Sequence, residues 1–328
     1  MISNPLSLCA DKPFIDMGST TTGCDSKDGS SETMSRERFA QEIAALEAMP
    51  GIDSILQPLL SYLQQPFEQQ DMQRIVDLIS HDNSLTAQCL HMANSPLYGL
   101  SQQITSPRAA VATLGLQRMR DITLSCCMLR LVPAGNDRQD LIALWEHSLA
   151  CALVSRKLAR RIGVRDPEQV YIAALLHDLG FMVNLRIAPR EFRILLKRAQ
   201  SEDRFIYDLE EEAWGCTHCD TGSMLAGRWE LAPLIIDVIQ YHHGLSEASA
   251  FRPTVALVAI CDQLCRANNL GLGQVEKLIV DWNNGDLVEV LKAEWPIARN
   301  INWTAAGTEL TGYLKEVRKL VAVLFRFH

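Results

Sequence analysis

Apolar side chains recur every three or four positions along most of the chain, the spacing that gathers them on one face of an α-helix. Residues 83–93 follow this pattern, and so do residues 70–79, whose apolar stripe consists of Met72, Ile75, Val76 and Ile79. Runs of β-branched residues with a period of two are absent from the sequence. The pattern therefore predicts an all-α fold.

Local signals mark where several of these helices begin and end. Ser35, followed by Glu37, predicts that regular structure begins near that position. Ser106-Pro107 predicts an N-cap followed by proline at the first helical position. Gly115 suits the residue just after the end of that helix, and a further helix should follow over residues 116–131.

The same reading divides the chain into segments. Residues 1–33 are rich in Ser, Thr, Gly and Asp without periodicity, which predicts a flexible tail. The helical pattern over residues 34–268 predicts one domain with two helical lobes, residues 34–132 and residues 133–268. Residues 269–328 predict a C-terminal helical extension.

Composition excludes several classes of protein. Of the 328 residues, 48% are hydrophobic and 21% charged, which excludes a fully disordered chain. Apolar stretches are shorter than the roughly 20 residues that span a bilayer, and the start lacks the basic and apolar regions of a secretory signal. We therefore expect a cytoplasmic protein without membrane contact.

Charge and cysteine content narrow the expected partners further. Against 31 basic residues stand 39 acidic ones, a net charge of −8, which disfavours nucleic acid as a partner. Ten cysteines without a secretory signal indicate a reducing compartment, where most act as small hydrophobic residues. Cys216 and Cys219 form a C-x-x-C without a preceding strand or a second ligand pair, so we interpret that spacing as incidental.

Metal-competent side chains on the apolar faces of the second lobe are the most informative feature. They are His147, His177, Asp178, His218, His242, His243 and Asp262. An inward carboxylate such as Asp262 costs several kcal/mol unless it is paired or binds a metal. Neighbouring residues on a helix point about 100° apart, so His177 and Asp178 can share one ion only near a helix end, or if Asp178 bridges two ions.

Each of these histidines alone has a structural explanation, as a packed core residue. Several helices that each offer an inward His or Asp form the arrangement in which a bundle holds ions between its helices. Imidazole with carboxylate suits Zn, Mn, Fe or Ni. The alternative is a fold whose histidines only pack.

Three motifs also occur in a fixed order: N-S-P-L-Y-G at residues 94–99, A-L-L-H-D-L-G at residues 174–180, and the pair His242-His243. In this order they resemble the HDOD family, the HD-related output domain of bacterial signalling proteins, within the HD superfamily of metal-dependent phosphohydrolases. The resemblance covers about residues 47–267. His81-Asp82 also reads "HD", but it lies in the first lobe, so we exclude it from the site.

The resemblance implies one or two divalent transition metal ions. One ion would be held by His147, His177, Asp178 and Asp262. Asp178 would bridge to a second ion held by His218, His242 and His243. Any catalysis would depend on Asp178 and His177.

Two departures from catalytic relatives bear on function. Such relatives often carry a Lys after H-D-x-G, where this chain has Phe181, and a G-Y-P-type loop follows their paired His, which residues 244–248 lack. We therefore expect a signal-transduction output module that acts through signalling proteins with weak or no catalysis. The alternative is a metal-dependent phosphohydrolase or phosphodiesterase acting on a nucleotide or cyclic dinucleotide.

Overall fold

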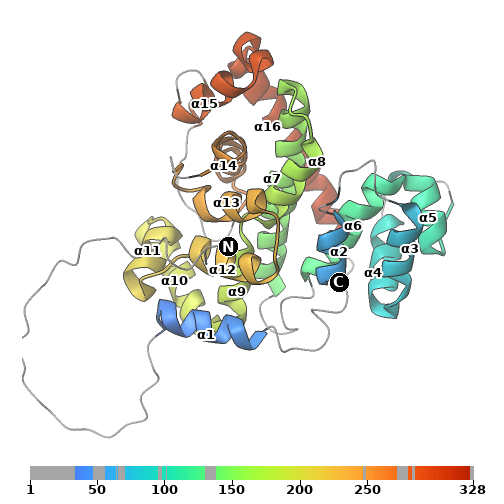
Figure 1. Cartoon of the computed structure of the whole chain (residues 1–328), viewed down its shortest axis with the longest axis horizontal. Helices are drawn as coiled ribbons and strands as arrows, with labels where there is room; N and C mark the ends of the chain where they lie inside the picture. The colour runs from blue at the N-terminus through green and yellow to red at the C-terminus, as the bar shows by residue number, and fades with distance from the viewer. Residues whose placement is uncertain are drawn as a thin grey trace, which may run out of the picture. The chain divides into compact units, whose positions relative to one another are not determined.

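A computed structural model describes residues 34–46, 56–63, 65, 71–94, 98–100, 102–129, 138–246, 249–271, 280–282 and 285–325 (Figure 1). Those residues form helices, turns and loops and contain no β-strand, so the predicted all-α fold is confirmed. The predicted tail, residues 1–33, lies outside the described residues.

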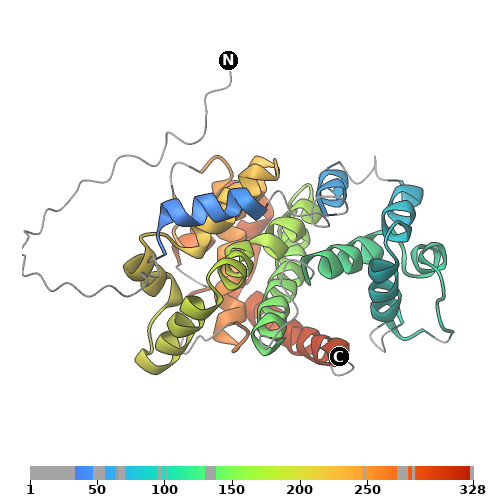
Figure 2. The same ribbon diagram turned by 90° about the horizontal axis from the view of Figure 1, so that it is seen from below.

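The first lobe is a group of five helices that pack against one another (Figures 1 and 2). They are α2 (Leu56–Leu63), α3 (Met72–Ser80), α4 (Asn83–Ala93), α5 (Pro107–Leu114) and α6 (Leu116–Leu129). Ser106 caps α5 as predicted, accepting a hydrogen bond from the Ala109 amide at 3.2 Å, and Gly115 follows with φ of 86°. Asp82 caps α4 through the Leu85 amide, which gives the excluded His81-Asp82 pair a structural role.

The second lobe is built around the long helix α7. Its helices are α7 (Arg138–Ile162), α8 (Pro167–Leu176), α9 (Leu179–Ile187), α10 (Pro189–Glu202), α11 (Ile206–Trp214), α12 (His218–Arg228), α13 (Pro233–Tyr241) and α14 (Arg252–Ala267). Both α8 and α14 pack along α7, while α9 packs on α12 (Figure 1). This arrangement brings the ends of α8, α12 and α13 toward the middle of the lobe.

Helices outside residues 133–268 also contact the second lobe. Helix α1 (Arg36–Leu46), which the sequence analysis groups with the first lobe, packs on α9 and α12, and its Phe39 ring lies 5.2 Å from Trp214. From the C-terminal extension, α15 (Asp286–Glu294) packs on α14 and α16 (Trp303–Phe325) on α7. Helical periodicity predicts such faces but does not indicate which neighbour covers them.

Arg156 on α7 links the two lobes. Its guanidinium lies 2.9 Å from Asp121 on α6 and 3.2 Å from Glu168 on α8, and it stacks over the Tyr171 ring at 4.2 Å. Burial raises the pKa of Asp121 to about 6 even though the arginine opposes that shift. A paired, partly buried guanidinium of this kind fixes α6 against α7 and α8.

Pro167–Ile187 is the one stretch within the described residues that is long and apolar enough to cross a membrane, and 89% of it is buried in the molecule. The helix is interrupted at His177 and Asp178, which cap α8 and α9. Its apolar character is therefore that of a core element of this lobe.

Helices α9 and α12 meet through two glycines. A Cβ atom on Gly180 would lie 1.8 Å from the carbonyl oxygen of His218, and one on Gly222 would lie 2.8 Å from the Gly180 nitrogen. Gly180 lies within α9, so its missing side chain allows close packing of the two helices. This contact sets how near His218 comes to Asp178.

We predict that Gly180→Ala lowers the free energy of unfolding by about 3 kcal/mol or more, because the added methyl group meets backbone rather than a movable side chain. Chemical denaturation of the purified protein measures this. Gly227→Ala, in the same helix as His218 and with open space around its Cβ, is the control and should be neutral or stabilising by up to ~1 kcal/mol. Equal effects of the two substitutions would contradict this account.

Candidate metal centre

All seven predicted side chains come together in the second lobe. His147 lies within α7 and Asp262 within α14, and the other five stand at or beside helix ends: His177, Asp178, His218, His242 and His243. Six of the seven are buried and His243 is partly exposed. The expected convergence is present, including the helix end that lets His177 and Asp178 face one site.

Three of the side chains form one half of the cluster. The Nε2 atom of His147 lies 3.1 Å from Nε2 of His177 and 3.1 Å from Oδ1 of Asp262. The Nε2 atom of His177 lies 3.9 Å from the same Asp262 oxygen. We call this set the Asp262 half.

Asp178 stands between this half and the remaining histidines. Its Oδ2 atom lies 3.3 Å from Nε2 of both His147 and His177. Its Oδ1 atom lies 3.4 Å from Nε2 of His242 and 3.8 Å from Nε2 of His218. One carboxylate thus presents one oxygen to each half.

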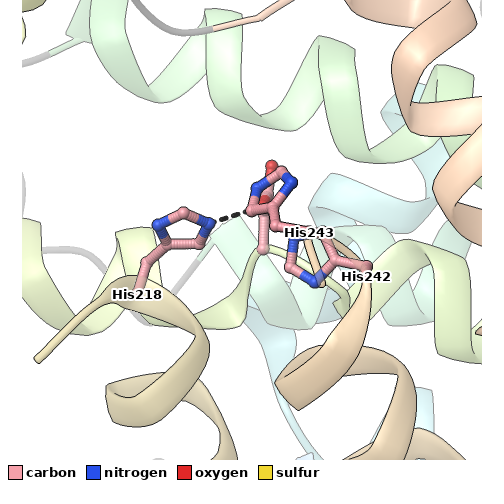
Figure 3. Close-up of side chains that lie close together, drawn as sticks. His218, His242 and His243 are labelled. Atoms are coloured by element: carbon pink, nitrogen blue, oxygen red, sulfur yellow. Dashed lines mark ion pairs between the residues drawn. The ribbon is translucent and has the colours of Figure 1, made fainter. Parts of the chain in front are cut away.

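His218, His242 and the partly exposed His243 form the second half with Asp178 Oδ1, and we call this set the His218 half. Figure 3 shows the His218 ring turned toward His242 and His243. Among the described residues, Asp178 Oδ1, His218 Nε2 and His242 Nε2 are buried without a hydrogen-bond partner. Buried polar atoms are rarely left so, and imidazole and carboxylate donors that converge without partners fit a transition metal ion.

In three of the imidazoles, the Nδ1 atom, which points away from the centre, contacts a main-chain carbonyl. His147 Nδ1 lies 2.9 Å from the carbonyl of Leu270, His177 Nδ1 lies 2.7 Å from that of Ala174, and His242 Nδ1 lies 2.9 Å from that of Ile239. A carbonyl accepts only from a protonated nitrogen, so these contacts place a proton on Nδ1 and direct Nε2 into the centre.

Glu210 plays the same role for Nδ1 of His218. It is not among the site residues predicted from the sequence. This fully buried residue of α11 accepts from His218 Nδ1 at 2.6 Å and from the His218 amide at 2.9 Å through Oε2, and from Asn184 Nδ2 at 2.9 Å through Oε1. Glu210 lies one residue after Leu209 and four after Ile206 on the apolar stripe of α11. That inward position was a signal in the sequence.

Two further residues shape the charge around the centre. Phe181 stacks on His218, with ring centroids 4.0 Å apart and an interplanar angle of 28°. Arg266, also missed from the sequence, is buried with Nη1 3.2 Å from Asp262 Oδ2 and 3.4 Å from His243 Nδ1. Positive charge therefore adjoins Asp262 and His243, while an apolar ring adjoins His218.

Contacts within the cluster shift the pKa values of its side chains. Burial alone would lower the pKa of both His177 and His242, but Asp178 raises the pKa of His177 to about 9, and Cys219 together with Asp178 raises that of His242 to about 10. Burial would raise the pKa of Asp178, yet the surrounding imidazoles hold it well below its usual value. Burial lowers the pKa of His243, with His242 adding to the effect, so its imidazole is neutral.

The thiols near the centre are free. Eight cysteines within the described residues are buried, in line with the hydrophobic role expected for most of them. Cys219 Sγ lies 3.8 Å from Nδ1 of His242, on the side of the ring that faces away from Asp178. Burial would raise the pKa of Cys219, but His242 and His218 lower it to about 7.

A cleft of about 1040 Å³ adjoins the centre. His242 and His243 line it together with residues of α14 and α15, among them Arg252 and the carboxylates of Asp286 and Glu289. The C-terminal extension thus forms part of the wall beside the histidine pair.

Residues 49–245 match the HDOD domain family. The chain belongs to the HDOD family. A crystal structure of an HDOD domain protein from Geobacter sulfurreducens is 29% identical, with a TM-score of 0.69, over 89% of this chain and 98% of that one. Family membership and the helical fold that it implies are therefore confirmed.

Two other proteins are similar to this chain, one in fold and one in sequence. A protein from Marinobacter aquaeolei VT8, provisionally named for signal transduction, shares the fold with a TM-score of 0.72 at 18% identity, over 88% of this chain and 65% of that one. A protein from Treponema pallidum is 29% identical over 212 residues, 62% of this chain. The chain spans 40% of the length of that relative.

We predict that metal binding to the protein releases protons and tightens as pH rises. At neutral pH the metal-free centre is protonated at His177, with a pKa of about 9, and at His242, with a pKa of about 10, whereas an ion needs the neutral rings. The apparent Kd for Zn²⁺ should fall between about pH 6 and about pH 8. Calorimetry in two buffers of different protonation enthalpy measures the proton release, and a pH-independent Kd would contradict the prediction.

Proposed function

We propose that this protein is a bacterial, cytoplasmic signal-transduction output module with an HD-type metal centre, acting through protein partners with weak or no catalysis. The observation that carries the metal centre is Asp178, whose two oxygens face two sets of imidazoles in a buried site. Partnerless buried donors support metal binding over simple packing.

Each half of the cluster would hold one divalent ion. His147, His177, Asp262 and Asp178 Oδ2 would hold the first, and Asp178 Oδ1, His218, His242 and His243 the second. The donor set suits Fe, Mn, Zn or Ni. Ions held in this way can polarise a phosphoester and activate water.

Phe181 is the reason we favour a module over an efficient enzyme. Its ring lies against His218, at the position where catalytic relatives often carry a lysine. A transition state rich in negative charge needs positive groups fixed in advance, and loss of one such donor costs roughly 10²–10³-fold in rate. The acidic net charge of −8 further favours protein partners over nucleic acid.

The alternative is a metal-dependent phosphohydrolase acting on a nucleotide or cyclic dinucleotide. The shared carboxylate of Asp178 favours it, because two ions bridged by one group can act on both sides of a phosphoester. In such an enzyme Asp178 would help to hold both ions, and Arg266 would supply positive charge beside Asp262.

We expect Asp178→Ala to reduce bound metal at least ~10-fold, because both halves lose an oxygen ligand. Elemental analysis and a thermal shift on adding Mn²⁺ or Zn²⁺ to the purified full chain measure this. Asp178→Asn keeps the side-chain shape and serves as the second variant. His81→Ala, in the H-D pair of the first lobe, is the control and should bind metal like the parent protein. Full metal content in Asp178→Ala would contradict the bridging role.

A substrate panel separates the module from the enzyme. We expect metal-loaded protein to show no turnover above background on nucleotides, phosphomonoesters and cyclic dinucleotides. Turnover that is abolished by Asp178→Asn would establish the phosphohydrolase instead. Absence of bound metal in the parent protein would remove both readings and leave a fold whose histidines only pack.

A further inference from the structure

We infer that the two halves of the centre are unequal: the His218 half takes the first ion and the Asp262 half takes a second ion more weakly. The inference rests on the proposed metal centre and adds an order of loading to it. Glu210 strengthens the first position as a positioning residue behind His218, and Arg266 weakens the second.

The His218 half is prepared for a cation. Within the described part of the chain, three of its inward atoms, Asp178 Oδ1, His218 Nε2 and His242 Nε2, are buried and make no hydrogen bond. The contacts among them are long, 3.4 Å from Asp178 Oδ1 to His242 Nε2 and 3.8 Å to His218 Nε2. An ion that enters between them offsets the cost of leaving buried polar atoms without hydrogen bonds.

In the Asp262 half, by contrast, the polar atoms already contact one another or a neighbouring side chain. His147 Nε2 lies 3.1 Å from both Asp262 Oδ1 and His177 Nε2, so these atoms already contact one another. Asp262 Oδ2 is paired with the buried Arg266 at 3.2 Å. An ion entering here must separate these contacts and lie beside a buried guanidinium, and like charges repel strongly where water is excluded.

Glu210 orients His218 and supplies negative charge from behind. It contacts both Nδ1 and the amide of His218, at 2.6 and 2.9 Å, so that ring and backbone are fixed together. Asn184 donates to the other oxygen of Glu210 at 2.9 Å, and Thr221 donates to Asn184 at 3.0 Å. A carboxylate behind a ligating imidazole raises its basicity, and loss of such a partner typically weakens metal binding 10–100-fold.

The proposal is tested by titrating the metal-free full chain with Zn²⁺ and following heat and stoichiometry. We expect two classes of site whose Kd values differ by at least ~10-fold. Glu210→Gln should weaken the tighter class ~10–100-fold and leave the weaker class unchanged. Glu211→Gln, an exposed neighbour on the same helix, is the control and should leave both classes unchanged.

Arg266→Met tests the other half. Removing the guanidinium should tighten the weaker class more than the tighter one, because Arg266 is paired with Asp262 and only borders His243. An equal change in both classes would overturn the unequal halves. Circular dichroism of each metal-free variant shows whether it is folded, so a loss of binding through unfolding is recognised. His81→Ala again serves as a variant distant from both halves.

The outcomes distinguish this inference from the proposed function. No Zn²⁺ binding to the parent chain would overturn the metal centre itself. Two classes of equal affinity, or a tighter class unaffected by Glu210→Gln, would overturn the unequal halves and leave the metal centre standing. A single bound ion that Glu210→Gln weakens supports the order of loading, whereas a single ion indifferent to that change overturns it.

Discussion

The centre depends on one buried carboxylate at the junction of two helices. Asp178 caps α9 directly after His177 caps α8, so neighbouring residues that would diverge on a continuous helix face the same interior space. A lone ionised carboxylate at this depth would be very unfavourable. The imidazoles that surround Asp178 offset that penalty, and in doing so they are drawn together from four other helical segments.

Groups around the cluster fix the positions of its imidazole rings. Main-chain carbonyls behind His147, His177 and His242 fix the imidazole rings, and Glu210 does the same for His218. Two glycines let α12 approach α9 closely enough to bring His218 within reach of Asp178. Local rigidity of this kind is what a ligand set needs if an ion is to find its donors already in place.

Much of this could be predicted from the sequence, for reasons that are local. Helical periodicity gives the all-α class, and an inward His or Asp on an apolar stripe is visible without coordinates, as at His147 and Asp262. Contacts between distant helices are not visible in this way. The pairing of Glu210 with His218 and the stacking of Phe181 on His218 each depend on how two helices cross, and periodicity carries no information about crossing. Arg266, in contrast, lies four residues after Asp262 on α14, a spacing that was visible in the sequence.

Helix α8 joins two features that are otherwise far apart. Near its start Glu168 pairs with Arg156 and so with α6 of the first lobe, and at its end stands His177. With a rise of about 1.5 Å per residue, its ten residues act as a stiff rod about 15 Å long. Glu168 and His177 lie at opposite ends of this one helix, so any tilt that separated Glu168 from Arg156 would also displace His177.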